Sequence, residues 1–225
     1  MIASLILAAG RGTRAATPTP KQYVELNGKT VLARTVERFL AVPRVDSITV
    51  VIGREDTEAY ENAVSVLDDK RLTPPVIGGE TRLHSVQAGL AALVKADPDH
   101  VLVHDAARPF VETAQIEALI EALQIHDSAF LAVPSVDALW RTDGGFAISP
   151  VDRTTIWRAQ TPQGFRFQKF LAAHRSFNGT AADDVEVARA AGILAKIIES
   201  TEANFKITTP DDIDRARARL ATKNR

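Results

Sequence analysis

The chain has 225 residues, a formal net charge of −1 and no cysteine. A nearly neutral chain gives no electrostatic reason to expect binding to nucleic acid or to a membrane surface. The lack of cysteine excludes disulfides and thiolate metal sites and agrees with a reducing compartment, so we expect a cytoplasmic protein.

Short, nearly continuous apolar runs alternate with amphipathic runs along the chain. The first apolar run, residues 4–8, is too short to span a membrane. Such runs are typical of parallel strands that are covered on both faces, and they recur at residues 47–52, 101–104, 129–133 and 196–199. Apolar residues spaced by three and four predict helices at residues 30–41, 82–94 and 113–126. The alternation predicts one α/β domain over residues 1–225, doubly wound around a mainly parallel sheet.

Residues 135–153 break this alternation. Asp143-Gly144-Gly145 stands between two short strand-like stretches, which predicts a projecting β-hairpin. Because an isolated hairpin is only marginally stable in water, we expect this arm to pack on something. A second copy of the chain is the simplest candidate, so a homodimer is expected.

A glycine-rich stretch, residues 7–14, follows the first predicted strand. Glycines let backbone N–H groups approach a polyphosphate, and Arg14 and Lys21 add the positive charge that a triphosphate requires. A dinucleotide-binding loop would need a helix here, but Pro18 and Pro20 stand in its path, and an interior proline costs about 3 kcal/mol. The Walker pattern is absent. The stretch therefore predicts an open phosphate-binding loop.

Two later stretches lie where ligands of such sheets bind, beyond the carboxyl ends of strands. Residues 78–82 form a glycine turn that opens a predicted helix, with Ser85 one turn in, and a helix N-terminus favours anions. Asp105 ends a predicted strand and is a candidate contact for Mg²⁺ or a ribose. His104 beside it is expected to be structural. Arg108 follows, fixed before a proline.

The chain shows no nucleophilic cysteine and no obvious serine–histidine pair. This matters little if an ionised phosphate attacks a nucleoside triphosphate, because alignment and cations then suffice. Arginines and threonines within residues 149–165 could hold an anionic second substrate, and Lys206 is another possible phosphate contact.

Six stretches occur in the order found in one known family: LAAGRGTR (7–14), PKQY (20–23), GGETRLHSV (78–86), VHDAARPF (103–110), VDRTTIWRAQTPQGF (151–165) and FKITTPDD (205–212). Over residues 5–216 the chain resembles the 2-C-methyl-D-erythritol 4-phosphate cytidylyltransferases of the non-mevalonate isoprenoid pathway. The resemblance implies a Rossmann-like nucleotidyltransferase fold, Mg²⁺ or another divalent cation, and a homodimer whose β-arms embrace. The implied reaction joins CTP and methylerythritol phosphate to a CDP-alcohol, with loss of pyrophosphate. Some family members are fused to another enzyme, and we expect no second domain here.

The resemblance also implies roles for individual residues. Arg14 and Lys21 would be catalytic and stabilise the α-phosphate in the transition state. The nucleotide would be held by Ala8, Ala9, Gly10, Gly79, Glu80, Arg82, Ser85 and Asp105. The sugar-alcohol phosphate would be held by Asp105, Arg108, Asp137, Arg153, Thr161 and Lys206, with Arg153 supplied by the partner subunit. The metal would rest mainly on CTP phosphates, with Asp105 as its candidate protein ligand.

The chain departs from the family at two places near the second substrate. Asp137-Ala138 replaces Asp-Thr on the arm, and residues 182–184 read Ala-Asp-Asp instead of Thr-Asp-Glu. Two alternatives stay open. One is ribitol 5-phosphate cytidylyltransferase, whose strand-end motif usually has Ser-Val where this chain has Ala106-Ala107. The other is a non-catalytic nucleotide-binding module, against which the retention of Arg14 and Lys21 argues.

Overall fold

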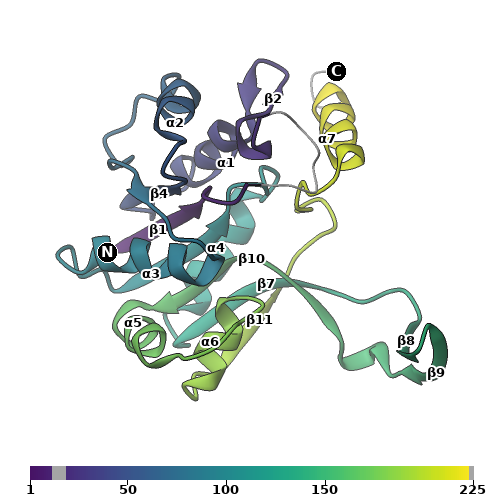
Figure 1. Cartoon of the computed structure of the whole chain (residues 1–225). Coiled ribbons are helices and arrows are strands. Elements are labelled where there is room, and N and C mark those ends of the chain that lie inside the picture. The colour runs from purple at the N-terminus through teal and green to yellow at the C-terminus, as the bar shows by residue number, and fades with distance from the viewer. Residues whose placement is uncertain (12–18, 223–225) are drawn as a thin grey trace.

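A computed structural model describes residues 1–11 and 19–222. Figure 1 shows a central sheet with helices on both sides. The sheet has seven strands, in the order β11 (Ala195–Glu199), β7 (Ser128–Pro134), β10 (Trp157–Arg166), β6 (His100–Asp105), β1 (Ile2–Leu7), β4 (Ser47–Ile52) and β5 (Val76–Ile77). Strand β10 runs antiparallel to both of its neighbours, and the other pairs are parallel. The predicted strands and the doubly wound, mainly parallel sheet are confirmed.

In the described ranges, three helices pack on each face of the sheet. On one face lie α1 (Val31–Leu40), α2 (Thr57–Val64) and α4 (Thr113–Ala122). The other face carries α3 (Arg82–Leu93), α5 (Phe167–Ser176) and α6 (Asp184–Ala190). Each face buries its own apolar cluster, which supplies the main driving force for folding. None of the helices in the described ranges is long and apolar enough to cross a membrane.

The C-terminal helix α7 (Pro210–Thr222) closes one end of the molecule. It packs on the small hairpin of β2 (Glu25–Leu26) and β3 (Lys29–Thr30), which follows the 3-10 helix η2 (Lys21–Tyr23). The rings of Phe110 and Phe205 lie 5.2 Å apart in the same cluster. This packing holds the segments around Phe110 and Phe205, which are distant in sequence, together near the carboxyl end of β6.

The predicted arm is a hairpin that projects from the sheet (Figure 1). Strands β8 (Leu139–Asp143) and β9 (Phe146–Val151) are joined by two glycines with φ of 53° and 87°. Positive φ at both turn positions matches the twist of a tight hairpin, which explains the Gly144-Gly145 pair. Four of its large apolar side chains are more than half exposed: Val136, Trp140, Phe146 and Ile148.

Candidate functional site

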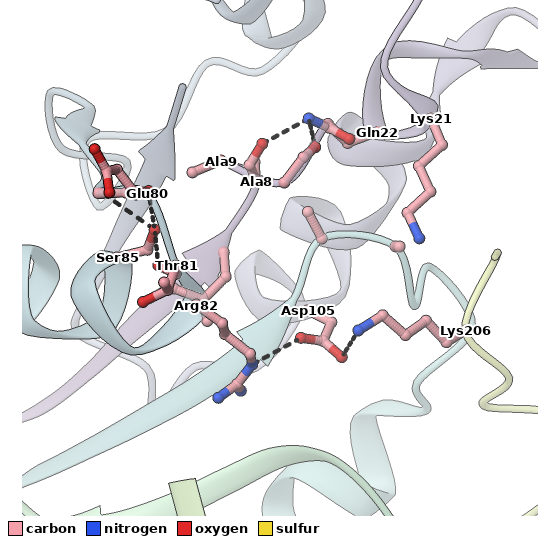
Figure 2. Close-up of a pocket in the computed structure, with 15 residues that line it drawn as sticks. Ala8, Ala9, Lys21, Gln22, Glu80, Thr81, Arg82, Ser85, Asp105 and Lys206 are labelled. Atoms are coloured by element: carbon pink, nitrogen blue, oxygen red, sulfur yellow. Dashed lines mark hydrogen bonds and ion pairs between the residues drawn. The ribbon is translucent and has the colours of Figure 1, made fainter. Parts of the chain in front are cut away.

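A pocket of about 260 Å³ opens beyond the carboxyl ends of β1, β5 and β6 (Figure 2). This is the edge at which ligands bind in parallel α/β sheets. Five segments of the described residues line it, and they include all eight predicted nucleotide contacts. From the predicted site the pocket gathers Ala8, Ala9, Gly10, Lys21, Gly79, Glu80, Arg82, Ser85, Asp105 and Lys206. Arg14 lies outside the described residues.

The first wall of the pocket is held in place by Gln22, which is buried. Its Nε2 donates to the carbonyl of Ala8 at 2.6 Å and to that of Gly10 at 3.1 Å. The Ala8 N–H donates to the carbonyl of Val51 at 2.7 Å. Sequence reasoning gave Gln22 no role, and its position inside the PKQY stretch was the only signal.

The second wall is the start of α3. The Thr81 hydroxyl accepts from the N–H of His84 at 3.2 Å and so caps the helix. The Ser85 hydroxyl accepts from the N–H of Gly79 at 3.2 Å and donates to the carbonyl of Thr81 at 3.0 Å. A Cβ on Gly79 would lie 2.4 Å from Cβ of His84, so only glycine fits. The capped N-terminus of α3 lies beside Gly79, which has no side chain. An anionic ligand can therefore approach this helix N-terminus closely.

Asp105 lies at the floor of the pocket among three cations. Its Oδ2 is 2.9 Å from Nζ of Lys206 and 3.5 Å from Nε of Arg108, and its Oδ1 is 3.6 Å from Nε of Arg82. Burial alone would raise the pKa of Asp105, but these three cations outweigh it and hold that pKa well below its usual range. Asp105 is therefore ionised at neutral pH and can only accept hydrogen bonds.

Arg82 is held from behind by a second carboxylate. Its Nη2 lies 2.6 Å from Oδ2 of Asp184, which is buried at the start of α6. Burial would lower the pKa of Arg82, but Asp184 and Asp105 together raise it. The sequence predicts no role for Asp184, although the family resemblance marks residues 182–184 as a departure from the Thr-Asp-Glu pattern.

Thr161 and His104 form a buried chain of hydrogen bonds behind Asp105. The Thr161 hydroxyl accepts from the N–H of Asp105 at 3.1 Å and lies 3.0 Å from Nδ1 of His104. The Arg108 carbonyl can only accept, so Nε2 of His104 donates to it at 3.1 Å and Nδ1 accepts from Thr161. His104 is thus structural, as predicted. The Thr161 side chain fixes the end of β6 and does not line the pocket.

The buried His104 should make the protein less stable as the pH falls. Burial lowers the pKa of His104 to about 4. In the unfolded chain histidine takes up a proton below about 6.5, so stability that is present above this pH is lost as the pH falls toward 4, by up to about 3 kcal/mol. Urea unfolding at several pH values should therefore show a smaller loss in His104→Gln than in wild type. Equal losses in both proteins would show that protonation of His104 does not cause the loss of stability.

The remaining predicted residues lie behind the pocket or on the arm. Arg108 is largely buried, and its Nη1 donates to the carbonyl of Asn204 at 2.8 Å. Asp137 and Arg153 are exposed on the arm and do not line the pocket of their own chain. The Arg153 guanidinium donates to the carbonyl of Val136.

Comparison with known proteins gives a consistent result over almost the whole chain. The family model described as 2-C-methyl-D-erythritol 4-phosphate cytidylyltransferase matches residues 2–222. A protein of that name from Cereibacter sphaeroides is 46% identical over 219 residues, which are 97% of this chain and 96% of the relative. The bifunctional enzyme IspD/IspF of Rhodospirillum rubrum is 44% identical over 96% of this chain, which spans 56% of that protein.

Solved structures agree with this result. The crystal structure of Francisella tularensis 2-C-methyl-D-erythritol 4-phosphate cytidylyltransferase superposes with a TM-score of 0.80 and 30% identity, covering 97% of this chain and 99% of that one. The sequence match, the fold and the residues that line the pocket therefore all indicate the same family. The chain belongs to the 2-C-methyl-D-erythritol 4-phosphate cytidylyltransferase family.

Proposed function

We propose that this chain transfers the cytidylyl group of CTP to 2-C-methyl-D-erythritol 4-phosphate and releases pyrophosphate. A phosphate oxygen of the second substrate bonds to the α-phosphorus of CTP, while the bond from that phosphorus to the oxygen bridging to the β-phosphate breaks. The attacking phosphate is already ionised at neutral pH, so neither a covalent nucleophile nor a strong base is required. The observation that carries the proposal is the pocket in which Lys21 and Lys206 face Asp105 (Figure 2).

The nucleotide lies between the two walls of the pocket in this proposal. Backbone N–H groups of residues 9–10 and 80–82 and the start of α3 stabilise the negative triphosphate. Lys21 contacts the α-phosphate, where charge increases as pyrophosphate departs. Arg14 is proposed to share that task, on sequence resemblance alone.

The second substrate is proposed to bind at the Asp105 end of the pocket. Asp105 is held ionised and can accept from substrate hydroxyl groups, while Lys206 balances the incoming phosphate. Arg108 and Thr161 hold Asp105 from behind. Asp137 and Arg153 complete the site from the arm of a second subunit.

A homodimer formed through the arms is part of the proposal. The arm exposes four large apolar side chains, and an exposed apolar patch marks an interaction surface. A second copy would cover them and carry its Arg153 toward this chain's pocket. We also propose that the enzyme acts in the cytoplasm, on the composition argument given above.

A divalent cation fits the pocket through the substrate. Mg²⁺ takes one or two carboxylates together with water and phosphate oxygens, and the pocket offers Asp105 and Glu80. Among the described residues no group of three or more histidine, aspartate or glutamate side chains could hold a metal. Asp105 already faces cations, so the ion would rest mainly on CTP phosphates. When bound, Mg²⁺ would neutralise part of the phosphate charge.

Pyrophosphate release tests the proposal directly. We expect release from CTP and Mg²⁺ with methylerythritol phosphate, and far less with ribitol 5-phosphate. Preference for ribitol 5-phosphate would establish the alternative cytidylyltransferase. Tight CTP binding without release in the presence of either acceptor would instead support a non-catalytic nucleotide-binding module.

A further inference from the structure

A cluster of buried polar side chains lies behind the second-substrate end of the pocket. It joins β10 to the segment between β11 and α7, residues 200–209, and its members Gln160, Ser200 and Asn204 are all at most 6% exposed. Figure 2 shows Lys206 entering the pocket from this segment. The cluster has no part in the proposed chemistry described above.

Asn204 makes the central contacts of the cluster. Its Nδ2 donates to Oε1 of Gln160 and to the carbonyl of Thr161, both at 2.9 Å. Oε1 of Gln160 also accepts from the Ser200 hydroxyl at 2.7 Å. The backbone carbonyl of Asn204 accepts from Arg108 at 2.8 Å. One buried residue is therefore bonded to the strand that carries Thr161 and to the arginine that pairs with Asp105.

Lys206 is held between two anchors of the same segment. Asn204 is two residues before it, and one residue after it the Ile207 N–H donates to the carbonyl of Ala107 at 2.9 Å. The lysine side chain has many rotamers, so its amine stays near Asp105 only if its backbone is fixed. Oδ1 of Asn204 is buried without a hydrogen-bond partner among the described residues. A buried polar side chain with an unpaired acceptor lowers stability, so stability alone does not explain an asparagine at this position.

We propose that Asn204 is a positioning residue for the second substrate: it fixes the backbone that aims Lys206 at Asp105. This rests on the proposed function for the identity of that substrate. Loss of the amide lets the Lys206 amine move away from Asp105, and displacement of a substrate-holding group by about 1 Å can cost about 100-fold in rate. CTP binding depends mainly on the two walls described above, around residues 8–10 and at the start of α3, and it is retained.

The kinetic test compares Asn204→Ala with Ser200→Ala. Both remove hydrogen bonds from the same cluster, but within the described part of the chain the Ser200 side chain bonds to Gln115 and Gln160 and not to the residues around Asp105. We expect Asn204→Ala to lower kcat/KM for methylerythritol phosphate about 100-fold and to keep wild-type CTP affinity in calorimetry. Ser200→Ala should keep wild-type kinetics at a lowered Tm. Equal kinetic losses in both variants, or none in Asn204→Ala, would overturn the proposal.

A second measurement needs no turnover. The amine of Lys206 is paired with Asp105, and the Lys206 side chain is about one third exposed. Acetylation of Lys206 by an amine-reactive ester, read by peptide mass spectrometry with Lys169 as internal reference, should be faster in Asn204→Ala than in wild type or Ser200→Ala. An unchanged rate would overturn the positioning role even if the wild-type chain proved inactive with methylerythritol phosphate. If Asn204→Ala is insoluble, Asn204→Ser, whose shorter side chain cannot reach both acceptors, gives the same readouts.

Discussion

Lys21→Ala is expected to lower kcat by about 100- to 1,000-fold while CTP binds almost as tightly as before. Figure 2 shows the Lys21 side chain extending from η2 into the pocket, with its amine directed toward Lys206 and Asp105. Negative charge increases on the α-phosphate and on the departing pyrophosphate only as the reaction proceeds. An interaction that strengthens at that stage contributes to kcat and little to ground-state affinity. Single-turnover rates and CTP calorimetry on the same samples separate the two quantities.

A matched lysine controls for the loss of one positive charge. Lys29 follows shortly after η2 and pairs with Glu37 on the surface, so Lys29→Ala should keep wild-type kcat. Lys21→Arg keeps the charge with a different geometry and should recover part of the rate. Should Lys21→Ala weaken CTP binding by the same factor as kcat, the transition-state role of this lysine would be wrong.

Much of the fold was predictable because buried faces repeat along the chain. Continuous apolar runs predicted the parallel strands, and spacings of three and four predicted α1, α3 and α4. The glycine pair of the arm was equally informative, since few residues other than glycine adopt positive φ at two successive positions. The parallel topology then explains why the ends of β1, β5 and β6 meet in one pocket.

Strand β10 was not predicted, and its sequence explains why. Pro162 lies in its interior, and proline argues against a central strand because it cannot donate to the sheet. The structure accommodates it where the pairing with β7 is interrupted, between Ala159 and Gln163. The residues that hold the site from behind were also missed. Gln22 and Asn204 act through contacts with distant segments, and such contacts leave no periodic pattern in the sequence.

Arg153→Ala is expected to lower kcat/KM for methylerythritol phosphate by up to about 100-fold at unchanged CTP affinity. Loss of a hydrogen-bonded charge pair to a phosphate costs about 3 kcal/mol at the upper end. Arg153 is exposed on the arm and does not line its own chain's pocket, so an effect on turnover would point to the pocket of a partner. Arg141→Ala removes another exposed arginine from the same arm and should keep wild-type turnover.

Mixed dimers decide whether the arm acts across the interface. In a dimer of Arg153→Ala with Lys21→Ala, one pocket keeps Lys21 and faces an arm that keeps Arg153, while the other pocket lacks both. If the arm reaches the partner's pocket, each mixed dimer has one working site and should recover half of the wild-type rate, although both parent variants are nearly inactive. An arm that serves its own subunit leaves no working site in the mixed dimer. If dimers purified through two different tags show no recovery, the proposal that each arm completes the partner's pocket is wrong, even if Arg153 proves essential.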